Sequence, residues 1–478
     1  MKNYLGQTLG LTILILGSLA GLTLLPSDLS IGNFALRRMD IFADIRYPGL
    51  DTLAVPETDS TWFVSDTSAV LPLPDSLAAD SSLTALAPLV DSALYGKIIE
   101  DYTPDQLGLN RFWASIDSIA FFKRTVRVAF FGDSFVEGDI LLGDLRDTLQ
   151  TLWGGNGVGF VPITSEVARF KRTLVHRYEN WNTFSIVKNH ESGQPFGING
   201  FVYRPKPAAF VHYEGADYFL HTRNWTQFRL FYQSAAKVPF VWQNAETQPQ
   251  IDSFPANAGK LSVWKQEQFQ IPFRAFAFRI DQPDSSLLLY GATLESGPGF
   301  YLDNFSVRGN TGGRLKLIRA ELAQQFDAYQ QYDLIIVQLG LNAALPNLNN
   351  IRWYRAELDQ TFDHLRKCFP NKPILIISVA DRAGKVDGNL STLPSVPAIA
   401  SMQRDLARHH GFLFYDLYHG MGGPGTMIQF AGQKPALANK DYTHLTHEGG
   451  KVMGHMFAGL FLDAQAKYHK TKTSQFSK

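Results

Sequence analysis

Continuous apolar runs recur along the second half of the chain, separated by amphipathic stretches of helical length. Leu334–Leu339 (LIIVQL) and Ile374–Val379 (ILIISV) are two of these runs, and Val126–Phe131 is a similar run much earlier in the chain. Such strands are typical of a parallel sheet that helices cover on both faces. We therefore predict a doubly wound α/β domain. Its expected strands are 126–131, 333–339, 373–379 and 412–415, and its expected helices are 140–153, 314–329, 353–368, 398–409 and 448–464.

A different pattern separates the first of these strands from the rest. Between about residues 165 and 305, short runs alternate apolar and polar positions, as in Phe228–Tyr232 and Ala275–Ile280, with Gly, Pro, Asn and Asp between them. This alternation predicts an all-β module of the sandwich type, inserted into the α/β domain. Its tryptophans form either a glycan-stacking platform or the core of the sandwich. They are Trp181, Trp225, Trp242 and Trp264.

The N-terminus carries an apolar run from Leu9 to Leu25, preceded by Lys2. A run of this kind at this place is typical of an export signal, either cleaved or kept as a membrane anchor. Residues of about 50–95, rich in Asp, Ser, Thr and Pro, read as a spacer. We expect an exported protein in the periplasm or on the cell surface, tethered to the membrane through its N-terminal segment.

These patterns define the expected organisation of the chain. The predicted parts are a signal or anchor at 1–30, a spacer with a short helical segment at 31–120, the two parts of the α/β domain at 121–165 and 301–465, the insertion at 166–300 and a basic tail at 466–478.

The charge and cysteine content exclude several kinds of partner. Lys and Arg together number 44, as do Asp and Glu, so the formal net charge is zero and a nucleic-acid partner is not expected. A single cysteine, Cys368, excludes an intramolecular disulfide and a zinc site with several cysteine ligands. We expect no metal and no cofactor.

Gly132-Asp133-Ser134 directly follows the first predicted strand. Ligands and catalytic loops gather at the carboxyl ends of strands in an open α/β sheet, and a glycine there allows the sharp turn that presents a serine hydroxyl. Ser134 is therefore a candidate nucleophile. The alternative is an ordinary turn in which Asp133 or Ser134 caps the next helix.

A serine nucleophile needs a base, and the base needs a group that orients it. Asp441 and His444 stand three residues apart before the last predicted helix, close enough for the carboxylate to bind the imidazole Nδ1–H. Thr446 can cap that helix. The alternatives are that His444 is a surface histidine, or that His447 is the base instead.

A developing oxyanion needs hydrogen-bond donors. The glycine-rich loop 307–313 precedes a predicted helix, so its backbone N–H groups are one source. Asn342 follows the LIIVQL strand and places its amide at the same sheet edge as Ser134. Either loop on its own is equally compatible with a simple turn.

The order Gly-Asp-Ser, Gly, Asn, Asp-x-x-His resembles the SGNH/GDSL hydrolase superfamily, whose α/β domain is flavodoxin-like. The resemblance implies that Ser134 is the nucleophile, that His444 is the base and that Asp441 orients it. It also implies an oxyanion hole made by the N–H groups of Ser134 and Gly309 and the side-chain amide of Asn342. The family commonly has an acidic residue after this asparagine, whereas this chain has Ala343.

Two longer segments resemble bacterial peptidoglycan O-acetylesterases, which carry a β-sandwich between the Ser and Gly blocks. The segments are GDSFVEGDILLGDLRDTLQTLWGGNGVGFVP and YGATLESGPGFYLDNFSVRGNTGG. This resemblance implies an acetylated cell-wall or surface glycan as substrate, an acyl-enzyme intermediate and an insertion that serves as a carbohydrate-binding module. The sequence leaves two alternatives open, a glycan O-acetyltransferase using the same site and a catalytically silent glycan-binding protein.

Three further residues are candidates for contacting the substrate: Asp133, Met421 and Gly422. Asp416 and His419 form a second polar pair of the Asp-x-x-His kind beyond a predicted strand. The loop that follows them either lines the substrate pocket or makes no contact with it.

Overall fold

The computed structural model describes residues 30–31, 34–35, 90–188, 193–266 and 271–476. The chain divides into two units, Met1–Ser82 and Leu83–Lys478. In the first unit, β1 (Ser30–Ile31) pairs antiparallel with β2 (Phe34–Ala35). The apolar run at 9–25 and most of the expected spacer lie outside the described residues. None of the helices among the described residues combines the length and the hydrophobicity that a membrane span requires.

The second unit contains a six-stranded sheet, in the order β14-β4-β15-β16-β19-β3. Its strands are β3 (Glu100–Asp101), β4 (Thr125–Gly132), β14 (Gly299–Ser306), β15 (Leu334–Gln338), β16 (Ile374–Ile377) and β19 (Leu413–Tyr415). Five of these strands, β4, β14, β15, β16 and β19, are parallel. β3 joins the edge of the sheet antiparallel to β19. In chain order the parallel strands lie 2-1-3-4-5, which is the flavodoxin-like arrangement. The predicted doubly wound α/β class is confirmed.

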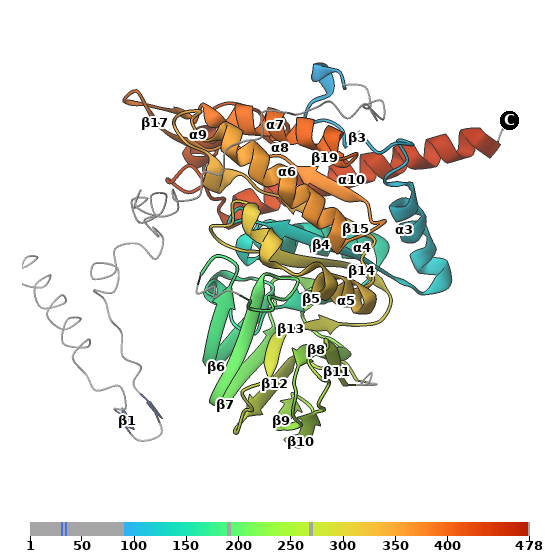
Figure 1. Cartoon of the computed structure of the whole chain (residues 1–478), viewed down its shortest axis with the longest axis vertical. Helices are drawn as coiled ribbons and strands as arrows, with labels where there is room; N and C mark the ends of the chain where they lie inside the picture. Colours follow the sequence, from blue (N-terminus) through green and yellow to red (C-terminus); the bar gives the residue numbers. More distant parts are fainter. Residues whose placement is uncertain (1–29, 32–33, 36–89, 189–192, 267–270, 477–478) are drawn as a thin grey trace, which may run out of the picture. The chain divides into compact units, whose positions relative to one another are not determined.

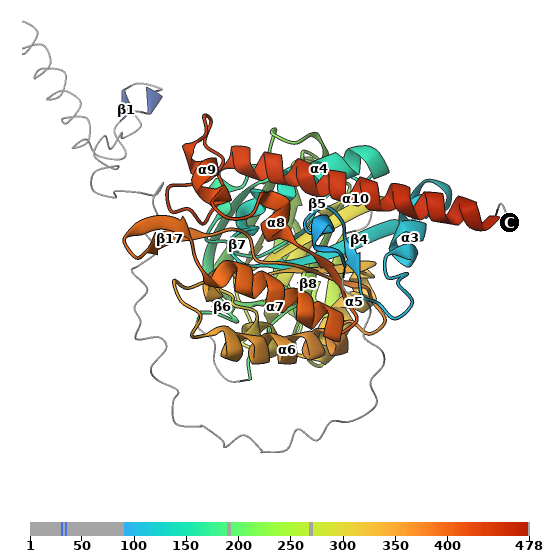
Figure 2. The ribbon, with the colours of Figure 1, turned by 90° about the horizontal axis from the view of Figure 1, so that it is seen from above.

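Helices cover both faces of this sheet (Figure 2). One face carries α3 (Asn110–Phe122), α4 (Leu142–Trp153) and α10 (His447–Phe476), and the other carries α5 (Ala320–Gln330), α6 (Ile351–Cys368) and α7 (Ser395–His409). In α6, Tyr354, Leu358 and Phe362 recur every fourth residue and are buried, so this helix presents one apolar stripe to its neighbours.

Short elements complete the α/β part. They are η2 (Ser92–Leu94), η3 (Glu137–Asp139), η6 (Gly313–Leu317), η7 (Leu341–Ala343), α8 (Leu417–Met421), α9 (Thr426–Gly432) and the hairpin of β17 (Ala383–Val386) and β18 (Asn389–Thr392).

Two helix boundaries differ from those predicted by more than three residues. The helix expected at 314–329 begins only at Ala320, because η6 ends where Ile318 and Arg319 adopt extended backbone angles. The last helix, expected to end at 464, continues to Phe476 through the residues assigned to a basic tail. His469 Nε2 lies 2.9 Å from Asp117 Oδ1 of α3, and this contact holds the extension against the body of the unit.

The insertion is antiparallel throughout. Its strands are β5 (Gly157–Val161), β6 (Leu174–Ser185), β7 (Phe201–Gly215), β8 (Gln227–Gln233), β9 (Val238–Asn244), β10 (Gln250–Phe254), β11 (Ser262–Gln266), β12 (Ala275–Ile280) and β13 (Leu288–Glu295), with η4 (Ala168–Phe170) and η5 (Leu220–Thr222) between them. The antiparallel strands therefore begin before residue 166 and end before residue 300.

These strands form two groups, β6-β7-β12-β9-β10 and β5-β13-β8-β11, joined by the single pair Leu289↔Tyr203. The two groups pack against each other. The rings of Phe228 in β8 and Phe276 in β12 stack with their centroids 3.8 Å apart. Trp225, Trp242 and Trp264 are all buried, so these three tryptophans belong to the core of the insertion and form no exposed platform.

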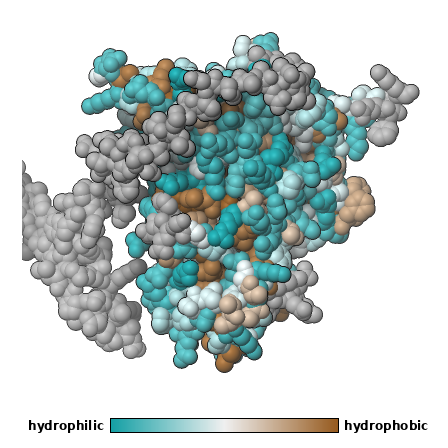
Figure 3. Space-filling view, in the orientation of Figure 1, coloured by the Kyte–Doolittle hydropathy of each residue, from teal (hydrophilic) through white to brown (hydrophobic). Residues whose placement is uncertain are grey.

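In Figure 1 the insertion lies below the α/β part, and a buried ion network joins the two. Arg127 of β4 lies 2.7 Å from Glu295 of β13 and 3.0 Å from Asp303 of β14. Asp303 also accepts a hydrogen bond from the backbone N–H of Phe160 in β5. Because such buried charges require their partners, this network fixes the orientation of the two parts. Hydrophobic side chains also gather at the level where the two parts meet (Figure 3).

Candidate active site

The turn after β4 presents Ser134 at the carboxyl edge of the parallel sheet. A Cβ atom at Gly132 would lie 2.1 Å from Val136 Cγ2, so any other residue here would force the buried Val136 side chain to move. β4 lies in the sheet between β14 and β15, which are the second and third parallel strands of the sequence. Ser134 therefore lies at the topological switch point, where open α/β sheets bind ligands.

Asp133 fastens this turn to the loop after β15. Its carboxylate is completely buried, and it accepts hydrogen bonds from the N–H groups of Phe135 (2.9 Å) and Leu341 (3.3 Å). Burial raises the pKa of Asp133 to about 6, although both hydrogen bonds act in the opposite direction. A side chain without exposed surface does not contact a substrate. The prediction that Asp133 contacts the substrate is therefore wrong. Asp133 instead joins the Ser134 turn to the loop after β15.

Ser134, His444 and Asp441 form a hydrogen-bonded row. His444 Nε2 lies 2.9 Å from Ser134 Oγ, and His444 Nδ1 lies 2.6 Å from Asp441 Oδ2. Asp441 Oδ1 accepts the N–H groups of Thr443 (2.9 Å) and His444 (3.1 Å), which fixes the carboxylate plane. Burial raises the pKa of Asp441, but the hydrogen bonds from His444 and Thr443 outweigh it and hold that pKa below its ordinary value. Asp441 is thus anionic at neutral pH.

Close backbone packing of α10 holds the His444 loop against the Ser134 loop. A Cβ atom at Gly450 would lie 2.0 Å from the carbonyl oxygen of Ile140, which follows η3. At the start of the helix, Thr446 Oγ1 accepts the N–H of Gly449 (3.1 Å) and donates to the carbonyl of Ala436 (2.6 Å). The expected cap at Thr446 is confirmed. The histidine reaches a serine 310 residues away because the helix that follows it packs on the segment that follows the serine.

The two candidate oxyanion loops lie at the same edge. The N–H of Val307 donates to the carbonyl of Gly132 (3.0 Å), which ties the Gly309 loop to the end of β4, and Gly309 has a φ of +81°. Asn342 Nδ2 donates to the Asn310 carbonyl (3.1 Å), which holds the side-chain amide in place. The second N–H of that amide makes no hydrogen bond with the residues that the structure describes, so it is available for a ligand.

Arg382 is a site residue that sequence reasoning missed. It follows β16 at the same sheet edge, and its Nη1 donates to the carbonyl of Leu341 (2.6 Å) beside Asn342. Burial lowers the pKa of Arg382, while Asp441 and Asp133 raise it, so this cation faces both carboxylates. Its signal in the sequence was its position in the loop that follows a predicted strand, three residues after the predicted end at residue 379.

The second Asp-x-x-His pair does not reach Ser134. His419 Nδ1 lies 2.7 Å from Asp416 Oδ2, and the ring is 45% exposed. Met421 packs in the hydrophobic core, and Gly422 lies in an exposed turn, its N–H donating to the His419 carbonyl. The structure shows no contact of Met421 or Gly422 with the Ser134, His444 or Asp441 side chains among the residues it describes.

One cluster of described residues has the spacing of metal ligands. Donor atoms of Asp359, His409 and His410 lie within 4.8 Å of one another, on α6 and at the end of α7. His410 Nε2 is 2.7 Å from Asp359 Oδ1, so a hydrogen bond already accounts for this contact. The cluster shares no residue with the row of Ser134, His444 and Asp441.

Residues 279–452 match the model of the GDSL-like Lipase/Acylhydrolase family. The match includes Gly309, Asn342, Asp441 and His444, whereas Ser134 precedes it. None of the curated proteins compared with the chain matches it.

Solved structures of carbohydrate-active esterases resemble the chain. A peptidoglycan O-acetylesterase is 20% identical, with a TM-score of 0.62, and the alignment covers 77% of this chain and 99% of that one. This likeness extends over both the α/β part and the insertion, and it shows a shared fold. A family two carbohydrate esterase from Cellvibrio japonicus is 10% identical, covering 60% of this chain and 99% of that one with a TM-score of 0.25. A family two carbohydrate esterase from Clostridium thermocellum, in complex with cellohexaose, is 10% identical, covering 60% and 100% with a TM-score of 0.26.

Proposed function

Because the chain carries a domain of the GDSL-like Lipase/Acylhydrolase family, we propose that it is a serine esterase that removes O-acetyl groups from a glycan through Ser134, His444 and Asp441. The observation that carries this proposal is the row of two short hydrogen bonds, 2.9 Å from Ser134 Oγ to His444 Nε2 and 2.6 Å from His444 Nδ1 to Asp441 Oδ2. A serine hydroxyl is a weak nucleophile until an oriented base accepts its proton.

The first half of the reaction forms an acetyl-enzyme. Ser134 Oγ attacks the acetyl carbonyl carbon while its proton passes to His444 Nε2, and Asp441 stabilises the resulting imidazolium. The N–H groups of Ser134 and Gly309 and the Asn342 amide donate to the oxyanion. When the intermediate collapses, the C–O bond to the sugar breaks and His444 returns the proton to the departing sugar hydroxyl.

The second half releases acetate. Water takes the place of the sugar, His444 Nε2 accepts one of its protons, and the hydroxide oxygen bonds to the acetyl carbon. Collapse of this intermediate breaks the bond to Ser134 Oγ, which regains a proton from His444. No external oxidant, reductant or co-substrate other than water is required.

A glycan substrate is supported by the shared fold with a peptidoglycan O-acetylesterase over both parts of the unit. Cell-wall glycans lie outside the cytoplasm, and the apolar run Leu9–Leu25 is typical of an export signal. We therefore place the enzyme outside the cytoplasm, held near the membrane by its N-terminal segment. Fractionation of cells that produce the full chain tests this: recovery only in the cytoplasm contradicts it.

The test of the function is acetate release from an O-acetylated glycan and from a small acetyl ester. The wild-type chain should release acetate from both, and the Ser134→Ala variant should be slower by about 10⁴-fold or more. Equal rates refute the serine mechanism. Acetyl transfer to an added oligosaccharide in excess of hydrolysis favours an acetyltransferase using the same serine. Glycan binding without acetate release identifies a silent glycan-binding protein.

A further inference from the structure

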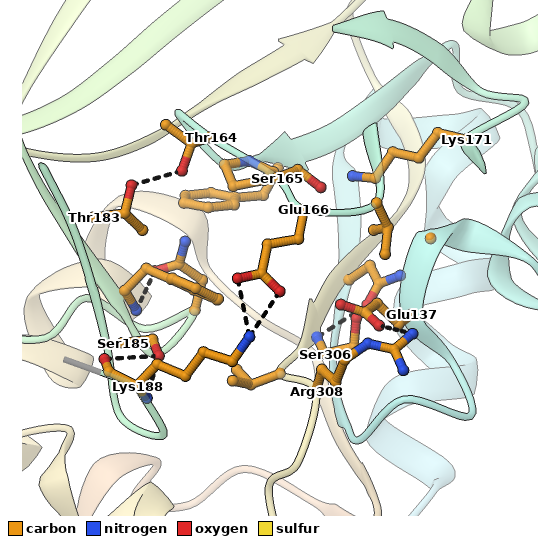
Figure 4. A pocket seen from close by; sticks show the side chains of 18 residues that line it. Glu137, Thr164, Ser165, Glu166, Lys171, Thr183, Ser185, Lys188, Ser306 and Arg308 are labelled. Carbon is orange, nitrogen blue, oxygen red and sulfur yellow. Dashed lines mark hydrogen bonds and ion pairs between the residues drawn. The ribbon is translucent and has the colours of Figure 1, made fainter. Parts of the chain in front are cut away.

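A cavity of about 140 Å³ lies between the α/β part and the insertion, next to the candidate active site. Glu137, three residues after Ser134, and Arg308, adjacent to Gly309, form one wall, and residues of β6 and the segment after β5 form the other. Figure 4 shows charged side chains from both walls pointing into the space between them. Ser134 is not in the lining, so a group bound in this cavity would not occupy the position of the reacting ester.

The charges that line this cavity do not cancel. Three cations face two carboxylates. Arg308 pairs with Glu137 at 2.7 Å, and Lys188 pairs with Glu166 at 3.0 Å (Figure 4). Each of the two carboxylates therefore has an ion-pair partner, and Lys171 is the cation of the lining that pairs with neither.

Lys171 has no counter-ion of its own. Within the described part of the chain, its ammonium group makes no hydrogen bond or ion pair, and in Figure 4 it points toward the centre of the cavity. Asp139 and Glu137 both raise the pKa of Lys171. Glu137 already pairs with Arg308. The Asp139 carboxylate already accepts from Arg146 and Thr173. The Asp139 carboxylate also accepts from Asn304 (2.8 Å), and it makes no hydrogen bond with Lys171 among the described residues.

The surroundings of Lys171 favour an added anion. Burial is the largest effect and lowers the pKa of Lys171; Asp139 raises it, Arg146 lowers it and Glu137 raises it, and the net change is downward. A partly desolvated ammonium beside a second cation is costly, and an anion in hydrogen-bond contact relieves that cost. A ligand carboxylate would satisfy the free donors of Lys171 and neutralise the excess charge of the lining.

We propose that Lys171 binds a carboxylate of the substrate, so that the enzyme selects O-acetylated glycans whose sugars carry an acid group close to the ester. This inference rests on the proposed glycan esterase function for the identity of the bound molecule. The carboxylate would sit between the two parts of the unit, where one end of the glycan meets the insertion while its acetyl group meets Ser134.

A binding experiment separates this inference from the esterase function. The probes are the non-acetylated disaccharide of N-acetylglucosamine and N-acetylmuramic acid, and the same disaccharide with its carboxylate converted to a methylamide. Neither contains an ester that the enzyme could cleave. Calorimetry with the full chain should show the acid binding about tenfold more tightly than the amide, because one charged hydrogen bond is lost.

The variants identify the cation responsible. Lys171→Met should abolish the preference for the acid, and Lys171→Arg should keep it. Lys188→Met is the matched control: it removes one positive charge from the same lining, but that cation is already paired with Glu166, so the preference should remain.

Equal affinity of the wild-type chain for the acid and the amide overturns the inference, as does loss of the preference in Lys188→Met to the same extent as in Lys171→Met. Hydrolysis of a neutral acetyl ester is measured in parallel. Normal hydrolysis without a preference for the acid refutes only the carboxylate site. A preference for the acid without any hydrolysis refutes the esterase and leaves the site.

Discussion

The chain contains two Asp-x-x-His pairs with nearly the same local geometry. In each, one carboxylate oxygen accepts the histidine backbone N–H, at 3.1 Å in Asp441–His444 and 3.0 Å in Asp416–His419. In each, the other oxygen lies close to Nδ1, at 2.6 Å and 2.7 Å respectively. Both pairs also lie at the carboxyl edge of the parallel sheet. Local sequence alone gives no reason to prefer either.

What differs lies on the far side of each histidine. His444 Nε2 faces Ser134 Oγ, and its ring is 18% exposed, whereas the His419 ring is 45% exposed beside the rings of Tyr95 and Tyr418. Asp416 is completely buried and pairs with Arg404, which also binds Glu100 of the edge strand β3. One pair therefore prepares a base for a nucleophile, and the other anchors α8 and β3 to the sheet. A dyad becomes catalytic through long-range packing, because its own geometry is the same in both places.

Replacing each histidine should separate the pairs most strongly. His444→Ala should lower kcat/KM for an acetyl ester by about 10³- to 10⁴-fold, since Ser134 loses its base. His419→Ala should stay within about twofold of wild type, because its ring contacts no group in the proposed mechanism. Steady-state hydrolysis of the same ester by both variants measures this. Comparable losses in the two variants would show that the placement of Ser134 does not decide function.

Replacing each aspartate should affect a different property: the rate in the Asp441 variant and the stability in the Asp416 variant. Asp441→Asn should lower kcat by about 10²-fold or more, because the amide no longer holds the imidazole for proton transfer. Asp416→Asn should leave kcat unchanged but lower the free energy of unfolding by about 3 kcal/mol, because the buried Arg404 keeps a charge with one partner fewer. Kinetics and chemical denaturation of both proteins check this. A rate loss in Asp416→Asn in fully folded protein would contradict the distinction.

The oxyanion donor gives the next largest effect. Asn342→Ala removes an amide that the Asn310 carbonyl already holds in place, and kcat should fall by about 10²-fold with KM little changed. Asn347→Ala, on an exposed stretch of the same loop, is a suitable control and should behave as wild type. An unchanged kcat in Asn342→Ala would leave the two backbone N–H groups as the only proposed donors.

The smallest effect concerns Asp133, which has no counterpart beside the second pair. Its pKa is about 6 in the folded chain and about 4 in the unfolded chain. The folded state therefore binds the proton more tightly, so the free energy of unfolding should fall as pH rises from about 4 to about 6, by up to about 3 kcal/mol. Denaturation curves of wild type and Asp133→Asn across this range should diverge by that amount. Parallel curves would show that the buried carboxyl does not titrate there.

Periodicity predicted the α/β part well, because buried parallel strands and amphipathic helices leave strong local signals. β4, β15, β16 and β19 lie within two residues of their predicted ends. The boundaries failed where local pattern does not decide structure. Residues 314–319 have helical periodicity, but Ile318 and Arg319 are extended. The strand β3 is two residues long, and only pairing with β19 makes it a strand.

The residue types and the chain order of the candidate site could be predicted from the sequence. The contacts that hold these residues in place could not. Ser134, Asn342, Asp441 and His444 each follow or precede a strong element, so the strand-end rule found them. The buried role of Asp133, the contact of Arg382 with the Leu341 carbonyl and the unpaired charge of Lys171 depend on which side chains pack together between segments far apart in the chain, 208 residues for Asp133 and Leu341 and 41 for Arg382 and Leu341. No local pattern carries that information.

The most direct test of the central claim is to locate the reactive serine. A serine-directed fluorophosphonate should label the wild-type chain at Ser134, as identified by mass spectrometry of its peptides, because only a serine with an oriented base reacts rapidly. His419→Ala should be labelled at the wild-type rate, and His444→Ala should be labelled at most very slowly. Labelling at another serine, or equal labelling of the His444→Ala and His419→Ala variants, would contradict the claim that long-range packing against Ser134 makes one Asp-x-x-His pair catalytic.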